Sequence, residues 1–70
     1  MRGQEDFIVQ VGKNIRNIRK LRSMTIGDVA EKIPMKEYAL NRIELGYCSC
    51  NLSTLKRIAD CLEVDIKIFL

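Results

Sequence analysis

Residues 25–46 of this chain read TIGDVAEKIPMKEYALNRIELG, and the spacing of their apolar and turn-forming residues decides the fold. Thr25 followed by Asp28 resembles a capping box, in which two side chains satisfy the free amides at the start of a helix. Pro34 removes a backbone donor and disfavours helical geometry in the residue before it. The stretch therefore predicts a short helix over residues 26–32.

A second apolar series follows the proline and predicts another helix over residues 36–45. The series consists of Met35, Ala39, Leu40 and Ile43. Gly46 suits the left-handed position just past the end of that helix. Two short helices joined by a turn of about three residues, with a longer helix before them, have the layout of a helix-turn-helix.

Apolar residues at helical spacing outside this stretch predict further helices over residues 6–22, 52–62 and 66–70. Asn51 or Ser53 can cap the helix over 52–62. The segment between 46 and 52 is expected to be an irregular surface loop, and residues 1–5 an N-terminal extension. We therefore expect residues 1–70 to form a single all-α domain of five helices.

The charge of the chain is unevenly placed, although the formal net charge is only +3. Residues 1–35 carry seven basic and four acidic side chains, and residues 36–70 carry five of each. Within residues 13–22 there is no acid, and the basic residues are Lys13, Arg16, Arg19, Lys20 and Arg22. This run predicts an anionic partner, although an ordinary solvated helix face has the same pattern.

Several function classes are disfavoured by composition. No apolar stretch approaches the roughly 20 residues that cross a bilayer, and no secretory signal is visible, so we expect a cytoplasmic protein without membrane contact. The chain has no His, and no Ser, Cys or Thr has an obvious activating partner, so we expect neither an enzyme nor a small-molecule substrate. Cys48, Cys50 and Cys61 lack a fourth zinc ligand and are interpreted as small apolar fillers, without metal or cofactor.

The segment from Val11 to Leu70 resembles the Xre and Cro family of phage-repressor-like helix-turn-helix domains. The resemblance is carried, in chain order, by Ile15-Arg16-x-x-Arg19-Lys20, Thr25-x-x-Asp28-Val29-Ala30-Glu31-Lys32, Leu40-x-Arg42-Ile43-Glu44-x-Gly46, and Leu52-x-Thr54-Leu55-x-x-Ile58-Ala59 with Leu62-x-Val64. It implies a five-helix, lambda-repressor-like domain that works as a homodimer on palindromic double-stranded DNA operators. It also implies an ion pair between Arg19 and Glu44 that ties the first helix to the reading helix and orients the guanidinium near a phosphate.

The helix over residues 36–45 is the candidate reader, because the major groove admits one helix and gives each base pair a distinct hydrogen-bonding pattern. Its outward positions, expected to contact bases, are Lys36, Glu37, Tyr38, Asn41 and Arg42. Arg42 can bind guanine bidentately, Asn41 can bind adenine, and Tyr38 can pack on a thymine methyl group or hold a phosphate. We expect Tyr38 and Arg42 to matter most.

Other residues are expected to hold the DNA backbone or a second subunit. The predicted backbone contacts are Arg19, Arg22, Thr25, Tyr47, Ser49 and Asn51. The predicted homodimer interface is the apolar chain end, with Ile66, Phe69 and Leu70, because a domain this small has difficulty burying such a face alone.

Some residues depart from the family pattern. Ile26 stands where the family has Gln, which disfavours direct readout from the helix over 26–32. Pro34 stands where the family has Gly, and its fixed φ of about −65° excludes the left-handed conformation, so we expect the turn to be built differently. Gly12 and Gly27 each weaken a helix by about 1 kcal/mol relative to Ala.

These observations favour a sequence-specific DNA-binding transcriptional regulator of the repressor type. Phage-type repressors, restriction-modification controllers and antitoxins all fit a domain of this length. One alternative is a protein-interaction module with the same fold that has lost operator reading. Another is a thiol- or metal-dependent enzyme or sensor that uses the cysteines.

Overall fold

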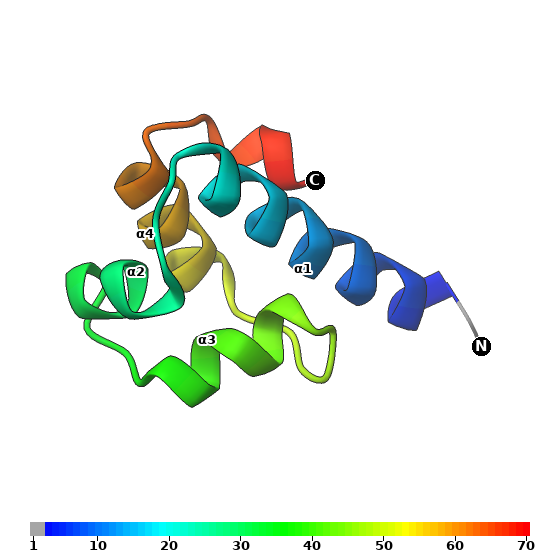
Figure 1. Cartoon of the computed structure of the whole chain (residues 1–70). Helices are drawn as coiled ribbons and strands as arrows, with labels where there is room; N and C mark the ends of the chain where they lie inside the picture. Colours follow the sequence, from blue (N-terminus) through cyan, green and yellow to red (C-terminus); the bar gives the residue numbers. More distant parts are fainter. Residues whose placement is uncertain (1–2) are drawn as a thin grey trace.

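The computed structural model describes residues 3–70, with side chains from residue 6 onward, and this part of the chain contains helices and no strands. The elements are α1 (Gly3–Leu21), α2 (Ile26–Lys32), α3 (Glu37–Glu44), α4 (Leu52–Leu62) and the 3₁₀ turn η1 (Ile66–Phe69) (Figure 1). The expected all-α class is confirmed. The fifth element is a single 3₁₀ turn rather than the α-helix that the sequence suggested.

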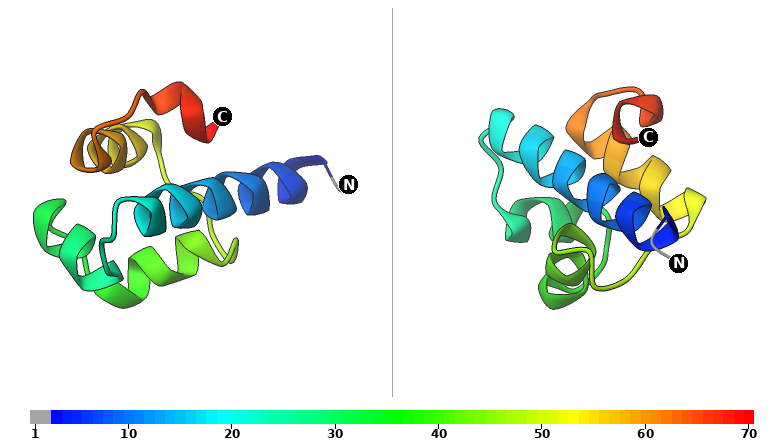
Figure 2. Two further views of the ribbon diagram at one scale, coloured as in Figure 1. Left: turned by 45° about the horizontal axis from the view of Figure 1, so that its top comes forward. Right: turned by 90° about the vertical axis from the view of Figure 1, so that its right-hand side faces the viewer.

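Helix α1 runs through the middle of the molecule, with α2 and α3 on one side and α4 with η1 on the other (Figure 2). The side chains that fill the centre come from every element, and the largest of those with essentially no exposure are Ile15, Val29, Leu40, Ile58, Leu62 and Phe69. A core drawn from all the helices holds α3 on one face of α1. The position of α3 therefore depends on the packing of the whole domain.

The predicted bounds of α2 and α4 are confirmed, and α3 is one residue shorter at each end than predicted. The predicted start of the first helix at residue 6 is wrong, because α1 already begins at Gly3. Residues 3–5 therefore belong to the helix and not to an extension, while residues 1 and 2 lie outside the described part.

Each of the four α-helices is followed by a residue with positive φ: Ser23, Pro34, Gly46 and Glu63. In each case the next amide donates to a carbonyl five residues earlier: Met24 to Arg19 at 3.1 Å, Met35 to Ala30 at 3.0 Å, Tyr47 to Arg42 at 2.9 Å and Val64 to Ala59 at 3.0 Å. This is the Schellman arrangement, which normally has glycine at the left-handed position. Only Gly46, as predicted, meets that preference.

The expectation that Pro34 forces a different turn is wrong. Its φ is +21°, and the amide of Met35 still closes the Schellman bond to Ala30. The close packing of α2 and α3 on either side sustains the turn.

Gly12 lies where α1 crosses the end of α3. A Cβ atom at this position would overlap the carbonyl oxygens of Ile43 and Glu44, which are backbone atoms that cannot swing aside. Gly12 thus allows the two helices to touch through their main chains. Glycine has a lower helix propensity than alanine, and the close approach of α1 and α3 offsets that loss of stability.

We predict opposite effects for two glycine-to-alanine changes. Gly12→Ala should lower the free energy of unfolding by about 1–3 kcal/mol, since the added methyl group forces α1 and α3 apart. Gly27→Ala is the matched control: the nearest atom to its Cβ is Oε2 of the flexible Glu37 side chain, at 2.9 Å, so the variant should gain up to about 1 kcal/mol of helix propensity. Urea unfolding followed by circular dichroism measures both, and a stabilised Gly12→Ala protein would contradict the packing described here.

We also predict that Ser23→Gly raises the free energy of unfolding by about 1 kcal/mol, because glycine lacks the Cβ that makes the left-handed conformation costly. Ser23 is exposed and has a φ of +56°, so its replacement opens no cavity. Ser23→Ala retains a Cβ and should leave stability nearly unchanged. Thermal and urea unfolding of the two variants test this, and equal stabilities for glycine and alanine would refute it.

Candidate nucleic-acid interface

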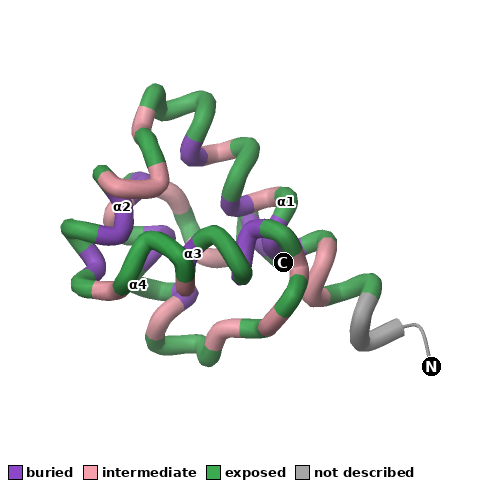
Figure 3. Tube along the Cα trace, turned by 60° about the horizontal axis from the view of Figure 1, so that its bottom comes forward, coloured by how far each residue is buried: buried purple, intermediate pink, exposed green. Residues whose placement is uncertain are grey.

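Helix α3 buries Leu40, Ile43 and Glu44 and turns its other side outward (Figure 3). The predicted base-contacting residues are all exposed, namely Lys36, Glu37, Tyr38, Asn41 and Arg42. Lys36 occupies the N-cap position and makes no side-chain capping bond. The helix therefore presents a continuous polar surface of mixed charge.

A buried ion pair joins α1 to the end of α3. Nε of Arg19 donates to Oε2 of Glu44 at 2.7 Å, and Nη2 donates to Oε1 at 2.9 Å. Nη1 donates to the carbonyl of Met24 at 2.9 Å. The hydrogen bonds to Glu44 raise the pKa of Arg19 above its ordinary value. The pair implied by the resemblance is confirmed, while a phosphate contact by Arg19 stays a prediction.

A polar hollow of about 170 Å³ opens beside this pair, between α1, the start of α2 and α3. It is lined by Arg16, Arg19, Ile26, Asn41, Glu44 and Leu45. Arg16 belongs to the basic run over residues 13–22, but it is not among the DNA contacts predicted from the sequence. The signal that could have found it is its position one turn before Arg19, which brings both residues to the α3 side of α1.

The start of α2 is capped as predicted. The amide of Asp28 donates to Oγ1 of Thr25 at 3.0 Å, and the amide of Thr25 donates to Oδ2 of Asp28 at 2.9 Å. The hydrogen bond from the Thr25 amide lowers the pKa of Asp28. The carboxylate of Glu37 lies close to Gly27. The negative charges of Asp28 and Glu37 therefore both lie at the start of α2, where Thr25 is predicted to hold a phosphate.

Arg42 and Tyr47 lie together at the C-terminal end of α3. The guanidinium carbon of Arg42 is 5.9 Å from the centre of the Tyr47 ring, within the range of a cation–π contact. Tyr47 remains exposed, unlike Met24, Met35 and Val64, which occupy the equivalent position of the other helix ends and pack against the core. The structure thus brings a predicted base contact and a predicted backbone contact side by side.

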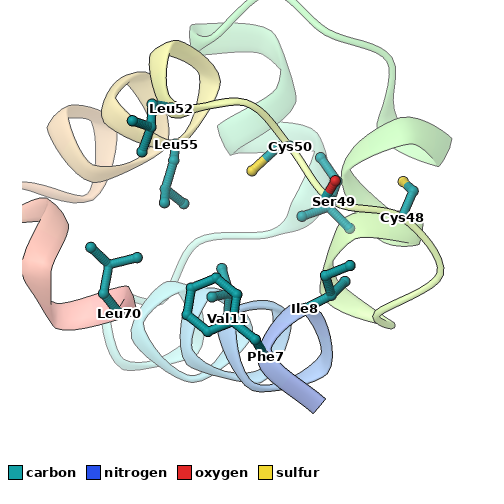
Figure 4. A pocket seen from close by; sticks show the side chains of 10 residues that line it. Phe7, Ile8, Val11, Cys48, Ser49, Cys50, Leu52, Leu55 and Leu70 are labelled. Carbon is teal, nitrogen blue, oxygen red and sulfur yellow. The ribbon is translucent and has the colours of Figure 1, made fainter. Parts of the chain in front are cut away.

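Three other predicted backbone contacts do not line the polar hollow between α1 and α3. Arg22 donates to the carbonyl of Glu63 at 3.2 Å, so it lies against the end of α4. Ser49 lines an apolar groove between the early turns of α1 and the start of α4 (Figure 4). Asn51 caps α4, because its Oδ1 accepts from the amide of Thr54 at 2.8 Å.

The prediction of Phe69 as a dimer contact is wrong, because its side chain has no exposure and fills the core. The η1 turn directs the ring inward, and the side-chain amide of Asn14 donates to the carbonyl of Phe69 at 3.2 Å. Ile66 is half-buried and packs against the core. Only Leu70 of the three predicted dimer residues is exposed.

The cysteines are free thiols, half-buried against the core. Burial raises the pKa of Cys50 and of Cys61, which disfavours the reactive thiolate. Within residues 3–70, no three His, Cys, Asp or Glu side chains gather as metal ligands do. None of the described helices combines the length and the apolar character that spanning a bilayer requires.

Residues 15–69 match the model of the HTH_3 family, described as helix-turn-helix. Among solved structures, the chain is similar to an HTH_3 family transcriptional regulator from Vibrio cholerae, with a TM-score of 0.86 and 29% identity. The similarity covers 93% of this chain but 36% of that one, so this chain spans about a third of the length of the regulator. No curated protein matches the chain.

We predict that Arg19→Ala destabilises the domain by about 3 kcal/mol, because it leaves the Glu44 carboxylate buried without its counter-charge. The double variant Arg19→Met with Glu44→Leu removes both charges and should recover most of that loss. Urea unfolding of the wild-type protein, the single variant and the double variant measures the effect. A double variant no more stable than Arg19→Ala would show that the buried charge is not the cause.

Proposed function

Because this chain belongs to the HTH_3 helix-turn-helix family, we propose that it is a sequence-specific double-stranded DNA-binding transcriptional regulator. The observation that carries the proposal is the exposed polar side of α3, which is held from behind by the Arg19–Glu44 pair. A single projecting helix of this kind fits the major groove of B-DNA.

Arg42 is the principal base-reading residue in this proposal. Its contact with the ring of Tyr47 limits the freedom of the guanidinium before DNA arrives, which reduces the entropy lost on binding. An ordered guanidinium can then bind N7 and O6 of guanine. Tyr38 and Asn41 extend the same surface, and Lys36 lies at the start of the helix.

Backbone phosphates are held near the C-terminal end of α3. Arg16 and Arg19 border the polar hollow between α1 and α3, and Tyr47 lies in the loop that follows the same end of the helix. Phosphate contacts of this kind set the register of a protein on the duplex without reading sequence. Asp28 and Glu37 repel a phosphate at the start of α2, so the affinity depends more on α1 and on the loop after α3.

The finer proposals concern assembly and regulation. The protein acts as a homodimer on a palindromic operator with half-sites about one helical turn apart, and it represses transcription in the cytoplasm. It has no enzymatic activity. Phage-type repressors, restriction-modification controllers and antitoxins are the candidate subclasses.

Selection of bound fragments from random duplex DNA tests this function directly. Enrichment of a palindrome would support both operator reading and twofold assembly. Failure to enrich any sequence, with equal affinity for all duplexes, would contradict sequence-specific regulation.

Two arginine variants should separate base reading from phosphate binding. Arg42→Ala should weaken binding to the selected sequence by about 1–3 kcal/mol and relax preference at one base pair. Arg16→Ala should weaken binding to all duplexes alike. It should also reduce the slope of log affinity against log salt concentration by about 1, which corresponds to the loss of one phosphate contact. Arg57→Ala, an exposed basic residue on α4, is the control and should change neither quantity. Fluorescence anisotropy over a salt series measures all three, and equal losses for Arg42→Ala and Arg57→Ala would exclude α3 as the reader.

A protein-interaction module with the same fold is the second candidate. It is favoured by the carboxylates of Asp28 and Glu37 at the start of α2 and by Ile26 in place of a polar residue. In that case DNA affinity would be weak, would lack sequence preference and would vanish at physiological salt.

A further inference from the structure

The start of α2 lies beside the outward side of α3 (Figure 1). Ile26, the first residue of α2, lines the polar hollow together with Asn41 of α3. One residue later, a Cβ atom on Gly27 would lie 2.9 Å from Oε2 of Glu37. Glu37 and Asn41 are one turn apart on α3, so both lie on the stripe of that helix that faces the start of α2. Ile26 therefore borders the predicted base-reading surface.

Ile26 brings an apolar side chain to a hollow that is mainly polar. Of the six residues that line the hollow, the apolar ones are Ile26 and Leu45. Ile26 is half-buried, because part of its side chain packs against the core while another part lines the hollow. An isoleucine makes no side-chain hydrogen bond to a phosphate or a base. It can, however, pack against an apolar group of the DNA.

The side chain of Ile26 is held in place before any ligand arrives. The capping box between Thr25 and Asp28 fixes the backbone at the start of α2 through hydrogen bonds of 3.0 and 2.9 Å. A β-branched side chain in a helix has one strongly preferred χ1 rotamer, and contact with the core restricts Ile26 further. An apolar surface that is already ordered loses little conformational entropy when a ligand covers it.

The apolar group that base pairs present in the major groove is the C5-methyl group of a pyrimidine. Thymine carries this group, and so does cytosine after methylation. Across the edge of an A·T pair, the N7 and N6 atoms of adenine are followed by O4 and then by the methyl group of thymine. The methyl group is thus next to the backbone of the thymine strand, where a residue beside a phosphate-binding hollow can reach it.

We propose that Ile26 determines specificity by packing against the C5-methyl group of a pyrimidine, in or next to the base pair that Asn41 binds. The proposal rests on the proposed function, because it assigns one more contact within the same DNA complex. Isoleucine in place of the glutamine of the family pattern removes hydrogen-bonded readout from α2. It replaces that readout with recognition of a methyl group.

Removal of single methyl groups from the DNA tests the proposal. Each thymine of one half of the selected sequence is replaced in turn by deoxyuridine, which lacks the methyl group and keeps the hydrogen-bonding groups. Fluorescence anisotropy measures the affinity of the whole chain for each duplex. We expect deoxyuridine at one position to raise the Kd about fourfold, the fold-change that corresponds to roughly 0.8 kcal/mol for one buried methyl group.

A second set of duplexes distinguishes the two sources of the methyl group. Each cytosine of the same half is replaced in turn by 5-methylcytosine. A gain in affinity at one position, with no effect of deoxyuridine at any thymine, would identify methylated cytosine as the base that Ile26 contacts. A loss with deoxyuridine identifies thymine.

Variants of the protein connect the methyl effect to Ile26. In Ile26→Ala, the methyl group should no longer affect the Kd, because the side chain that covers it is missing. Ile26→Gln removes the apolar surface in a second way, and Ile26→Val should retain most of the effect. Leu45→Ala is the matched control, since it truncates the other apolar residue of the hollow and should retain the whole effect. Thermal unfolding first establishes which variants fold.

A selected sequence whose affinity depends on no C5-methyl group would overturn the proposal and leave the proposed function standing. A methyl effect that persists in Ile26→Ala and Ile26→Gln, or one that disappears in Leu45→Ala alone, would also overturn it. If the protein prefers no duplex, the proposed function fails and the role of Ile26 fails with it.

Discussion

The bidentate contact between Arg19 and Glu44 is the constraint on which the rest of the structure depends. Both side chains are almost wholly withdrawn from water, so neither can be left alone without a large electrostatic cost. The guanidinium also binds the carbonyl of Met24, which lies just before α2. One side chain therefore fixes the end of α1, the approach to α2 and the end of α3, and these three elements surround the candidate reading surface.

The parts of the fold that the sequence predicted are those with local signals. The capping box at Thr25 and the apolar period of α4 depend on neighbouring residues, so the bounds of α2 and α4 could be predicted. The start of α1 lacks such a signal. The burial of Phe69 was equally beyond prediction, because an apolar chain end suits a core and an interface alike, and only the path of η1 decides between them.

The same distinction applies to the candidate site. Exposure along α3 follows from helical periodicity, and the predicted outward residues do face solvent. Which basic residues of α1 lie beside α3 could not be predicted, because the orientation of α1 relative to α3 and α4 places Arg16 at the polar hollow and Arg22 against the end of α4. The left-handed positions at Ser23, Pro34 and Glu63 were also missed, since tertiary packing there overrides the preference for glycine.

The contact at Gly12 has a consequence for how this domain can diverge. Because α1 and α3 meet through main-chain atoms, the distance between their axes is set by peptide geometry and not by the size of an intervening side chain. Substitutions elsewhere in the core can alter stability while leaving that separation unchanged. The outward residues of α3 can thus vary, and can acquire new base preferences, while the position of α3 relative to α1 stays the same.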